Sequence, residues 1–181
     1  MVMKKNRTKP EMLESMARHA LQHGLNSASL RPLARAAGTS DRMLIYHFGS
    51  KEGLVRELLL FLANDLAARL DKALPKGRAK NRHACIAEIV ALLRTEPFLP
   101  FMKTWFDIVS AAAQGGQDHL QAGNAMMSGF HGWLKHRLPE GEEEPDALAA
   151  AMLTLVEGIA VMDKVGQREM ADIAMRTLFP K

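Results

Sequence analysis

The chain has 181 residues, 48% of them hydrophobic and 24% charged, which is the balance of a folded globular protein rather than a disordered one. No uninterrupted apolar run approaches the ~18 residues that span a bilayer, and the basic N-terminus is not followed by an apolar stretch, so we expect neither a membrane span nor a secretory signal. The single cysteine, Cys85, cannot form an internal disulfide, and the expected location is the cytoplasm.

The net charge of +4 is unevenly distributed along the chain. Residues 1–56 hold ten lysines and arginines against four acidic residues, a balance of +6, whereas the remaining 125 residues hold 14 against 16. A basic excess at one end of a folded chain is typical of a surface that binds a polyanion. A solvated basic face would give the same count, so charge alone does not decide the function.

The first predicted helix begins after Thr8. Thr8 and Glu11 form a capping box, with Pro10 in the first turn, where no backbone amide is needed. The apolar residues that follow recur at the spacing of a core-facing helix, at Leu13, Met16, Ala17, Ala20 and Leu21. Gly24 predicts a left-handed cap at the end of this helix.

Two short helices and a longer one are predicted next. Ser29 is the expected N-cap of the first, which places Pro32 at its third position, and Gly38 is its expected end. Ser40 then caps a helix that reaches residue 48, and Ser50 caps the longer fourth helix. The two short helices, 29–37 and 40–48, are therefore joined by a turn of about three residues.

Beyond a charged connection at 75–80, the pattern predicts five more helices, at roughly 81–95, 98–114, 117–138, 145–164 and 167–179. The expected fold is all-α, with about nine helices. Residues 1–53 are expected to form one three-helix domain and residues 54–181 a second helical domain, bridged by the fourth helix.

Two short helices joined in this way have the dimensions of a helix-turn-helix, whose second helix enters the major groove of DNA. If Leu44, Ile45 and Phe48 face the core, the opposite side of that helix faces the DNA. We expect Arg42 to pair with a guanine and Met43 to contact a thymine methyl group. The other predicted contacts, mainly to phosphates, are Ser29, Thr39, Ser40, Asp41, Tyr46, His47 and Lys51.

These residues resemble the TetR family of bacterial regulators over positions 8–62. The resemblance rests on four segments in order: SLRPLARAAG at 29–38, TS at 39–40, LIYHF at 44–48 and SKEGL at 50–54. The chain departs from the family at Ile45, the usual tyrosine position, and at Arg42 and Met43, where smaller residues are usual. The resemblance implies a C-terminal helical domain that forms a homodimer through the last two helices and holds a small-molecule pocket.

Residues that could line such a pocket lie in two regions rich in aromatic residues and methionine, which the family uses for its ligand cavity. Methionine adapts to apolar ligands of varied shape, although ordinary core packing would explain the same residues. Polar residues on these largely apolar helices could orient the ligand. The candidates are Met102, Trp105, Phe106, Asn124, Met127, His131 and Glu157.

The predicted dimer rests on the helix at 145–164, which combines a large apolar side with small residues that permit close helix approach. The same pattern fits a helix at the centre of a monomer's core. A protein that recognises DNA through one short helix also needs two copies of that helix to gain sequence specificity.

Other chemistry has little support in the sequence. His19 and His23 are spaced to share a metal ion, but no third ligand type lies nearby, so no metal is expected. Cys85 is interpreted as a small buried residue rather than a sensor thiol. We find no Glu-x-x-His pair, no Gly-x-Ser-x-Gly elbow and no glycine-rich phosphate loop, and therefore expect neither catalytic residues nor a cofactor.

The leading hypothesis is a ligand-responsive repressor that binds a palindromic operator in double-stranded DNA as a dimer, with a largely apolar effector. One alternative is a helical-bundle enzyme or small-molecule carrier whose basic N-terminal region is incidental. Another is a sequence-unspecific architectural protein, which the modest charge excess disfavours.

Overall fold

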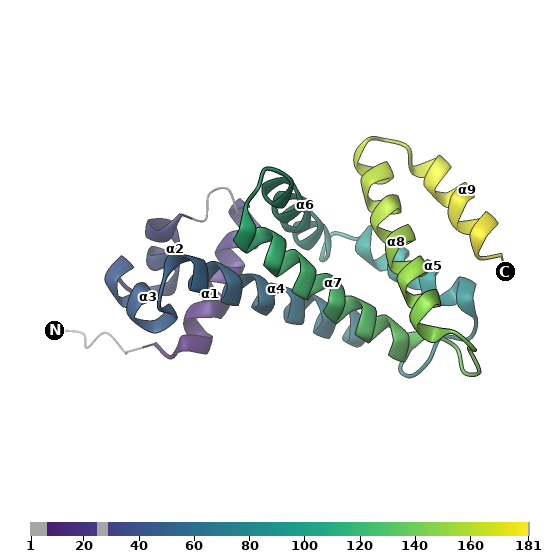
Figure 1. The fold of residues 1–181 in the computed structure, drawn as a ribbon, viewed down its shortest axis with the longest axis horizontal. Helices are drawn as coiled ribbons and strands as arrows, with labels where there is room; N and C mark the ends of the chain where they lie inside the picture. Colours follow the sequence, from purple (N-terminus) through teal and green to yellow (C-terminus); the bar gives the residue numbers. More distant parts are fainter. Residues whose placement is uncertain (1–6, 25–28, 181) are drawn as a thin grey trace. The chain divides into compact units, whose positions relative to one another are not determined.

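The structure, a computed structural model, describes residues 7–24 and 29–180 (Figure 1). Within these ranges it has nine helices and no strand, so the predicted all-α class is confirmed. The predicted bounds of the five C-terminal helices are correct to within two residues. The helices are α1 Lys9–His23, α2 Leu30–Ala37, α3 Asp41–Phe48, α4 Lys51–Ala73, α5 Arg82–Leu93, α6 Leu99–Ala113, α7 Gln117–Arg137, α8 Pro145–Lys164 and α9 Arg168–Leu178.

The helices form two compact units. The first comprises Met1–Asp65 and Pro100–Met126, and the second comprises Leu66–Leu99 and Met127–Lys181. Helices α4 and α7 therefore begin in the first unit and end in the second. These units follow packing rather than chain order, and the functional boundary predicted between residues 53 and 54 remains a prediction.

Helix α1 begins as the sequence predicts. The Glu11 carboxylate accepts hydrogen bonds from the backbone N–H of Thr8 at 2.7 Å and from the Thr8 hydroxyl at 3.0 Å. At the other end, Gly24 has a φ of +82°, but its ψ of 159° is extended. The expected left-handed cap is therefore wrong, and the chain leaves α1 in an extended direction that glycine adopts without strain.

The buried face of α1 differs slightly from the expected one. Met16, Ala17 and Ala20 are buried as predicted, and Met12 joins them with 2% of its surface exposed. Leu13 and Leu21 are only half-buried. The apolar face is therefore rotated toward Met12, which the spacing alone did not distinguish from Leu13.

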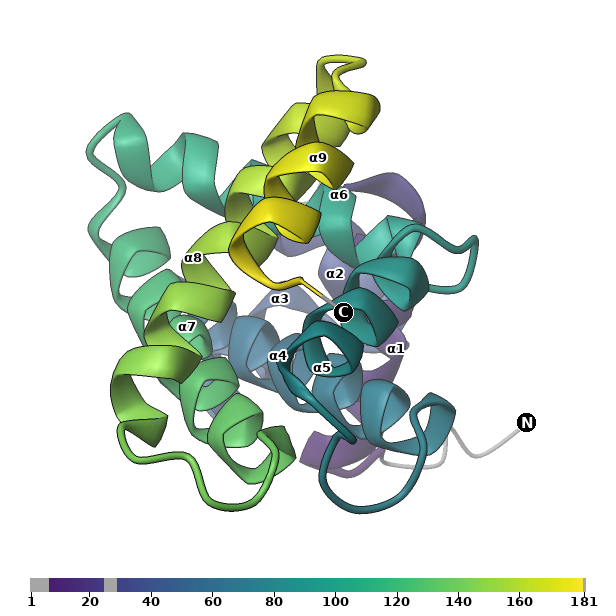
Figure 2. The ribbon, with the colours of Figure 1, turned by 90° about the vertical axis from the view of Figure 1, so that its right-hand side faces the viewer.

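The second unit is held together by a polar cluster as well as by apolar packing. Helices α8 and α9 lie side by side, and α5 contacts both (Figures 1 and 2). Arg94, which directly follows α5 as its C-cap, binds both carboxylate oxygens of Asp163 in α8, at 2.7 and 2.8 Å, and Asp172 in α9 at 2.7 Å. One guanidinium thus connects three helices.

Helix α8 is the one helix among the described residues that is long and apolar enough to cross a membrane, judged by length and composition alone, with mean hydropathy 1.5 over 18 residues. The absence of long uninterrupted apolar runs led us to expect no membrane-spanning helix, whereas by length and mean hydropathy α8 would qualify as one. Its contacts with α5 and α9, and the ion pair from Asp163 to Arg94, are nevertheless those of a helix packed in a protein bundle.

Cys85 lies inside the second unit. Its side chain is buried, and burial raises the pKa of the thiol to about 11. A thiol with this pKa is almost entirely protonated at neutral pH and reacts slowly, because the thiolate is the nucleophile. The interpretation as a small buried residue is confirmed.

Candidate nucleic-acid interface

The turn between α2 and α3 sets the start of the predicted recognition helix. Gly38 adopts a left-handed conformation, with φ +68° and ψ 28°, which closes α2. Its N–H donates to the Arg35 carbonyl at 3.0 Å, and the N–H of Thr39 donates to the Ala34 carbonyl at 2.9 Å. The Ser40 hydroxyl then accepts from the Met43 N–H at 3.3 Å and caps α3. Each of these capping residues is one that the sequence predicted.

Helix α3 is anchored by two side chains. Leu44 is fully buried and Phe48 is 6% exposed, whereas Ile45, predicted to share this face, is half-buried. On the opposite side Arg42 is exposed, and Tyr46 exposes 78% of its surface. An aromatic side chain this exposed gains nothing from the protein interior, and so is free to contact another molecule.

The other predicted contacts on α3 are less open. Met43 and His47 are half-buried at the edges of the exposed face. The Nε2 atom of His47 is buried and makes no hydrogen bond, and the Tyr46 ring stands edge-on to the imidazole with 5.4 Å between ring centroids. A phosphate contact from His47 therefore requires its Nδ1 atom or a rotated ring.

Predicted phosphate contacts lie at both ends of the motif. Ser29 is exposed, and its hydroxyl makes no capping hydrogen bond. Lys51 is exposed at the first position of α4, where free backbone amides favour an anion. The neighbouring carboxylate of Glu52 has a lowered pKa, because it is hydrogen-bonded to its own backbone N–H and to the Ser50 hydroxyl. Glu52 is therefore negatively charged at neutral pH, next to the positive charge of Lys51.

The structure adds one exposed cation that the sequence analysis did not include. Arg31, the second residue of α2, exposes 84% of its side chain, and its Nε atom lies 3.9 Å from the Asp41 carboxylate. This long, exposed pair is weak and leaves the guanidinium free to exchange partners. Thr39 and Asp41, both predicted contacts, are half-buried beside the turn.

The histidine pair of α1 lies apart from this surface. The rings of His19 and His23 have centroids 4.5 Å apart, and the pKa of His19 is lowered by burial and then by the nearby His23. Across residues 7–24 and 29–180 no group of three potential metal ligands occurs. The pair is thus a contact between two rings.

The predicted effector residues fall in both units. In the first, Met102 is buried, Trp105 and Phe106 are half-buried, and Asn124 is exposed. In the second, Met127, His131 and Glu157 are half-buried. The Nε2 atom of His131 lies 3.0 Å from the carbonyl oxygen of Asp146, so this ring nitrogen already has a partner.

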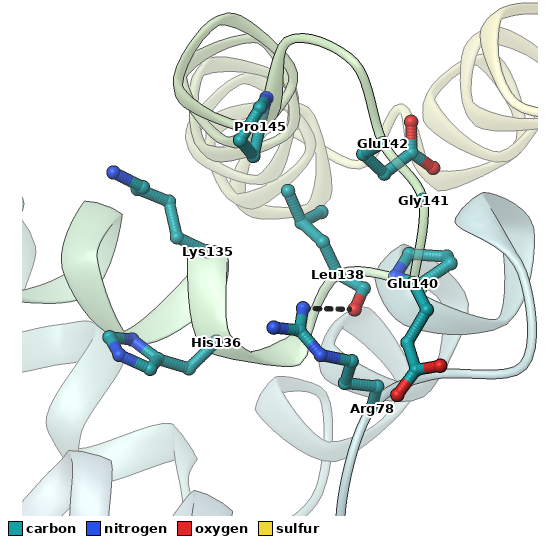
Figure 3. A pocket seen from close by; sticks show the side chains of 9 residues that line it. Arg78, Lys135, His136, Leu138, Glu140, Gly141, Glu142 and Pro145 are labelled. Atoms are coloured by element: carbon teal, nitrogen blue, oxygen red, sulfur yellow. Dashed lines mark hydrogen bonds between the residues drawn. The ribbon is translucent and has the colours of Figure 1, made fainter.

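A pocket of about 490 Å³ lies in the second unit, where α7 ends and α8 begins (Figure 3). Charged side chains line much of it, among them Arg78, which donates a hydrogen bond to the Leu138 carbonyl at 3.1 Å. None of the seven predicted effector residues lines this pocket. Its lining is Arg78, Lys135, His136, Leu138, Pro139, Glu140, Gly141, Glu142 and Pro145.

Comparison with known proteins identifies the motif. Residues 13–58 match the model for bacterial regulatory proteins of the tetR family, within the region 8–62 on which the resemblance rests. These residues are therefore similar to the N-terminal region of TetR-family regulatory proteins. This match favours a transcriptional regulator over the enzyme alternative.

A comparison over most of the chain also finds a transcriptional regulator. The chain is 28% identical to the HTH-type transcriptional regulatory protein RaaS of Mycobacterium tuberculosis over 154 residues, which cover 84% of the chain. It spans 66% of the length of that curated relative.

Solved TetR-like structures share the fold. A transcriptional regulator from Rhodococcus has a TM-score of 0.64 at 23% identity, over 93% of this chain and 92% of the other. A TetR transcription regulator from Haloarcula marismortui has a TM-score of 0.66 at 15% identity, over 93% and 92%. The multidrug binding protein EbrR, solved with imidazole, has a TM-score of 0.64 at 18% identity, over 95% and 94%. At these identities the likeness concerns the fold alone.

Proposed function

We propose that this chain is a TetR-family repressor that binds a palindromic operator as a homodimer, with α3 of each copy in the major groove. The observation that carries the proposal is the two-sided character of α3. Leu44 and Phe48 anchor one side, and the other presents Arg42 and Tyr46 to solvent. A basic side chain and an exposed aromatic ring on a short, capped helix fit base and phosphate contacts.

The proposed dimer uses α8 and α9. Large apolar side chains are exposed on these two adjacent helices and at the C-cap of α8, although other residues of the same helices pack inside the unit. An apolar surface of this kind is typical of a protein–protein interface, and a second copy of the chain would cover it. The exposed residues are Val161, Val165, Met170, Ile173 and Leu178.

We further propose a cytoplasmic protein whose operator binding is released by a largely apolar effector. The aromatic and methionine-rich faces of α6 and α7 support this, as does the fold shared with EbrR, which is described as a multidrug binding protein. Such an effector would have to bind the state that releases DNA better than the state that holds it.

The proposed function is tested by selection of duplexes from a randomised DNA pool with the full-length protein. Enrichment of an inverted repeat, binding of that duplex in the presence of competitor DNA, and two chains per duplex in sedimentation experiments are the expected results. Equal affinity for unrelated duplexes at several salt concentrations would exclude a sequence-specific regulator, because unspecific binding depends on phosphate contacts alone.

Arg42→Ala is expected to weaken binding to the selected duplex by about 1–3 kcal/mol and to relax the preference at one base position in each half-site, if Arg42 pairs with a guanine. Arg42→Lys should lose most of the same preference, because lysine keeps the charge but not the planar fork. Both effects are measured as the affinity of each variant for duplexes that are changed at single base positions. A loss that is equal for all duplexes would assign Arg42 to a phosphate instead.

A further inference from the structure

Of two cations at the start of the described chain, Arg7 binds the end of α2, next to the turn that precedes α3, and Lys9 contacts the last residue of α3. We propose that Arg7 and Lys9 are positioning residues that hold α3 at the angle at which it reads DNA. We call this pair the N-terminal clamp. Its DNA readout rests on the proposed function, whereas its effect on α3 can be measured in the free protein.

Arg7 contacts the end of α2, next to the turn that precedes α3. Its Nη1 atom donates to the Ala36 carbonyl at 3.3 Å and to the Ser15 hydroxyl at 3.1 Å. A Cβ atom built on Gly38 would lie 3.4 Å from the guanidinium carbon, so the guanidinium lies directly against this glycine. Arg7 therefore joins α1 to the last turn of α2, next to Gly38, where the backbone takes its left-handed conformation.

Lys9 contacts the C-terminal end of α3. Its Nζ atom lies 2.7 Å from the Glu57 carboxylate in α4 and 4.8 Å from the centroid of the Phe48 ring, the last residue of α3. A positive charge at the first position of a helix opposes the helix dipole. The contacts with Glu57 and Phe48 compensate for this placement and join α1, α3 and α4 at a single atom.

Helix α3 needs such support because it is short. It has eight residues, and only Leu44 and Phe48 are buried. An isolated helix of this length is not stable in water, so its orientation depends on its contacts with neighbouring elements. The clamp fixes the end of α2 that leads into α3 through Arg7 and the last residue of α3 through Lys9, so it restrains the helix from both sides.

Each contact of the clamp is partly exposed, since the Lys9 and Glu57 side chains are 39% and 33% exposed. Exposed ion pairs and cation–π contacts are individually weak. We therefore expect Lys9→Met and Arg7→Met each to weaken binding to the selected duplex by about three- to tenfold. Arg18→Met is the matched control, because it removes one positive charge from α1 and the hydrogen bond of Arg18 goes to Glu14 on the same helix.

A salt series separates positioning from direct phosphate contact. If the clamp positions α3, the slope of log affinity against log salt stays unchanged in both variants, and Lys9→Arg retains most of the binding. If Lys9 or Arg7 contacts a phosphate, the slope falls by about one for each cation removed, which would overturn the proposal. Glu57→Gln adds an opposite-sign test: positioning predicts weaker binding, whereas a Lys9 released to contact DNA would bind more tightly.

Hydrogen exchange in the free protein tests the clamp without DNA. The amides of α3 should exchange faster in Arg7→Met and Lys9→Met than in the wild type, with those of α8 unchanged and with no effect of Arg18→Met. Unchanged exchange in α3 would overturn the clamp even if DNA binding falls. Faster exchange in α3 together with no selected duplex at all would support the clamp and contradict the proposed function.

Discussion

Gly53→Ala is expected to destabilise the protein by about 1–3 kcal/mol, the range found for overpacked sites, although alanine is the better helix former. A Cβ atom at this position would lie 2.3 Å from the Phe48 carbonyl oxygen, which belongs to the backbone and cannot rotate away. The end of α3 would have to move away from α4, and we expect DNA binding to fall with stability. Chemical denaturation and binding to the selected duplex measure the two effects.

The control for this prediction is Gly129→Ala. Gly129 lies within α7, and nothing is within 4 Å of the position its Cβ would take. There alanine should stabilise the protein by about 0.5–1 kcal/mol, the usual gain over glycine in a helix. If Gly53→Ala also stabilises the protein, the close approach of α3 to α4 at this point is incorrect.

Arg94→Met is expected to lower the free energy of unfolding by about 2–4 kcal/mol, somewhat less than a fully buried pair would lose. The Arg94 side chain is 14% exposed, and its removal leaves the carboxylates of Asp163 and Asp172 near one another without a counter-charge. The cost comes from these two partly desolvated anions rather than from the lost ion pairs themselves. Urea denaturation at neutral pH measures it.

A triple variant, Arg94→Met with Asp163→Asn and Asp172→Asn, separates the two contributions. It removes the unpaired charges and should recover much of the lost stability, since replacing all partners of an ion pair costs less than removing one. A triple variant as unstable as Arg94→Met alone would show that the arginine stem, and not its charge, holds α5 to α8 and α9.

Local signals predicted the helices and the candidate interface well. Ser40, Gly38 and Ser50 each act through their own backbone or the next turn, so their roles can be read from a few neighbouring residues. The exposed face of α3 followed from the same local reasoning. The expected partner of Leu44 and Phe48, Ile45, is only half-buried, because it lies about 100° around the helix axis from Leu44, at the edge of the buried stripe.

Contacts between distant residues could not be predicted in this way. Arg94 binds carboxylates that are 69 and 78 residues away in the sequence, and Lys9 binds Glu57, which is 48 residues away. An arginine at the end of a helix looks the same in the sequence whether it faces solvent or two aspartates. The pocket residues share this limitation, since spacing along α6 and α7 cannot tell a cavity lining from ordinary packing.

The two helices shared between the compact units affect how the chain can be divided experimentally. Within residues 7–24 and 29–180, no single cut in a loop releases the first unit intact, because this unit includes Pro100–Met126, and its boundaries at Asp65 and Met126 fall inside α4 and α7. A nick at either boundary would leave helical stubs, and the Gln117–Met126 stub of α7 is too short to persist alone. The truncation product would lose part of its own interior, so functional studies of DNA binding call for the undivided polypeptide.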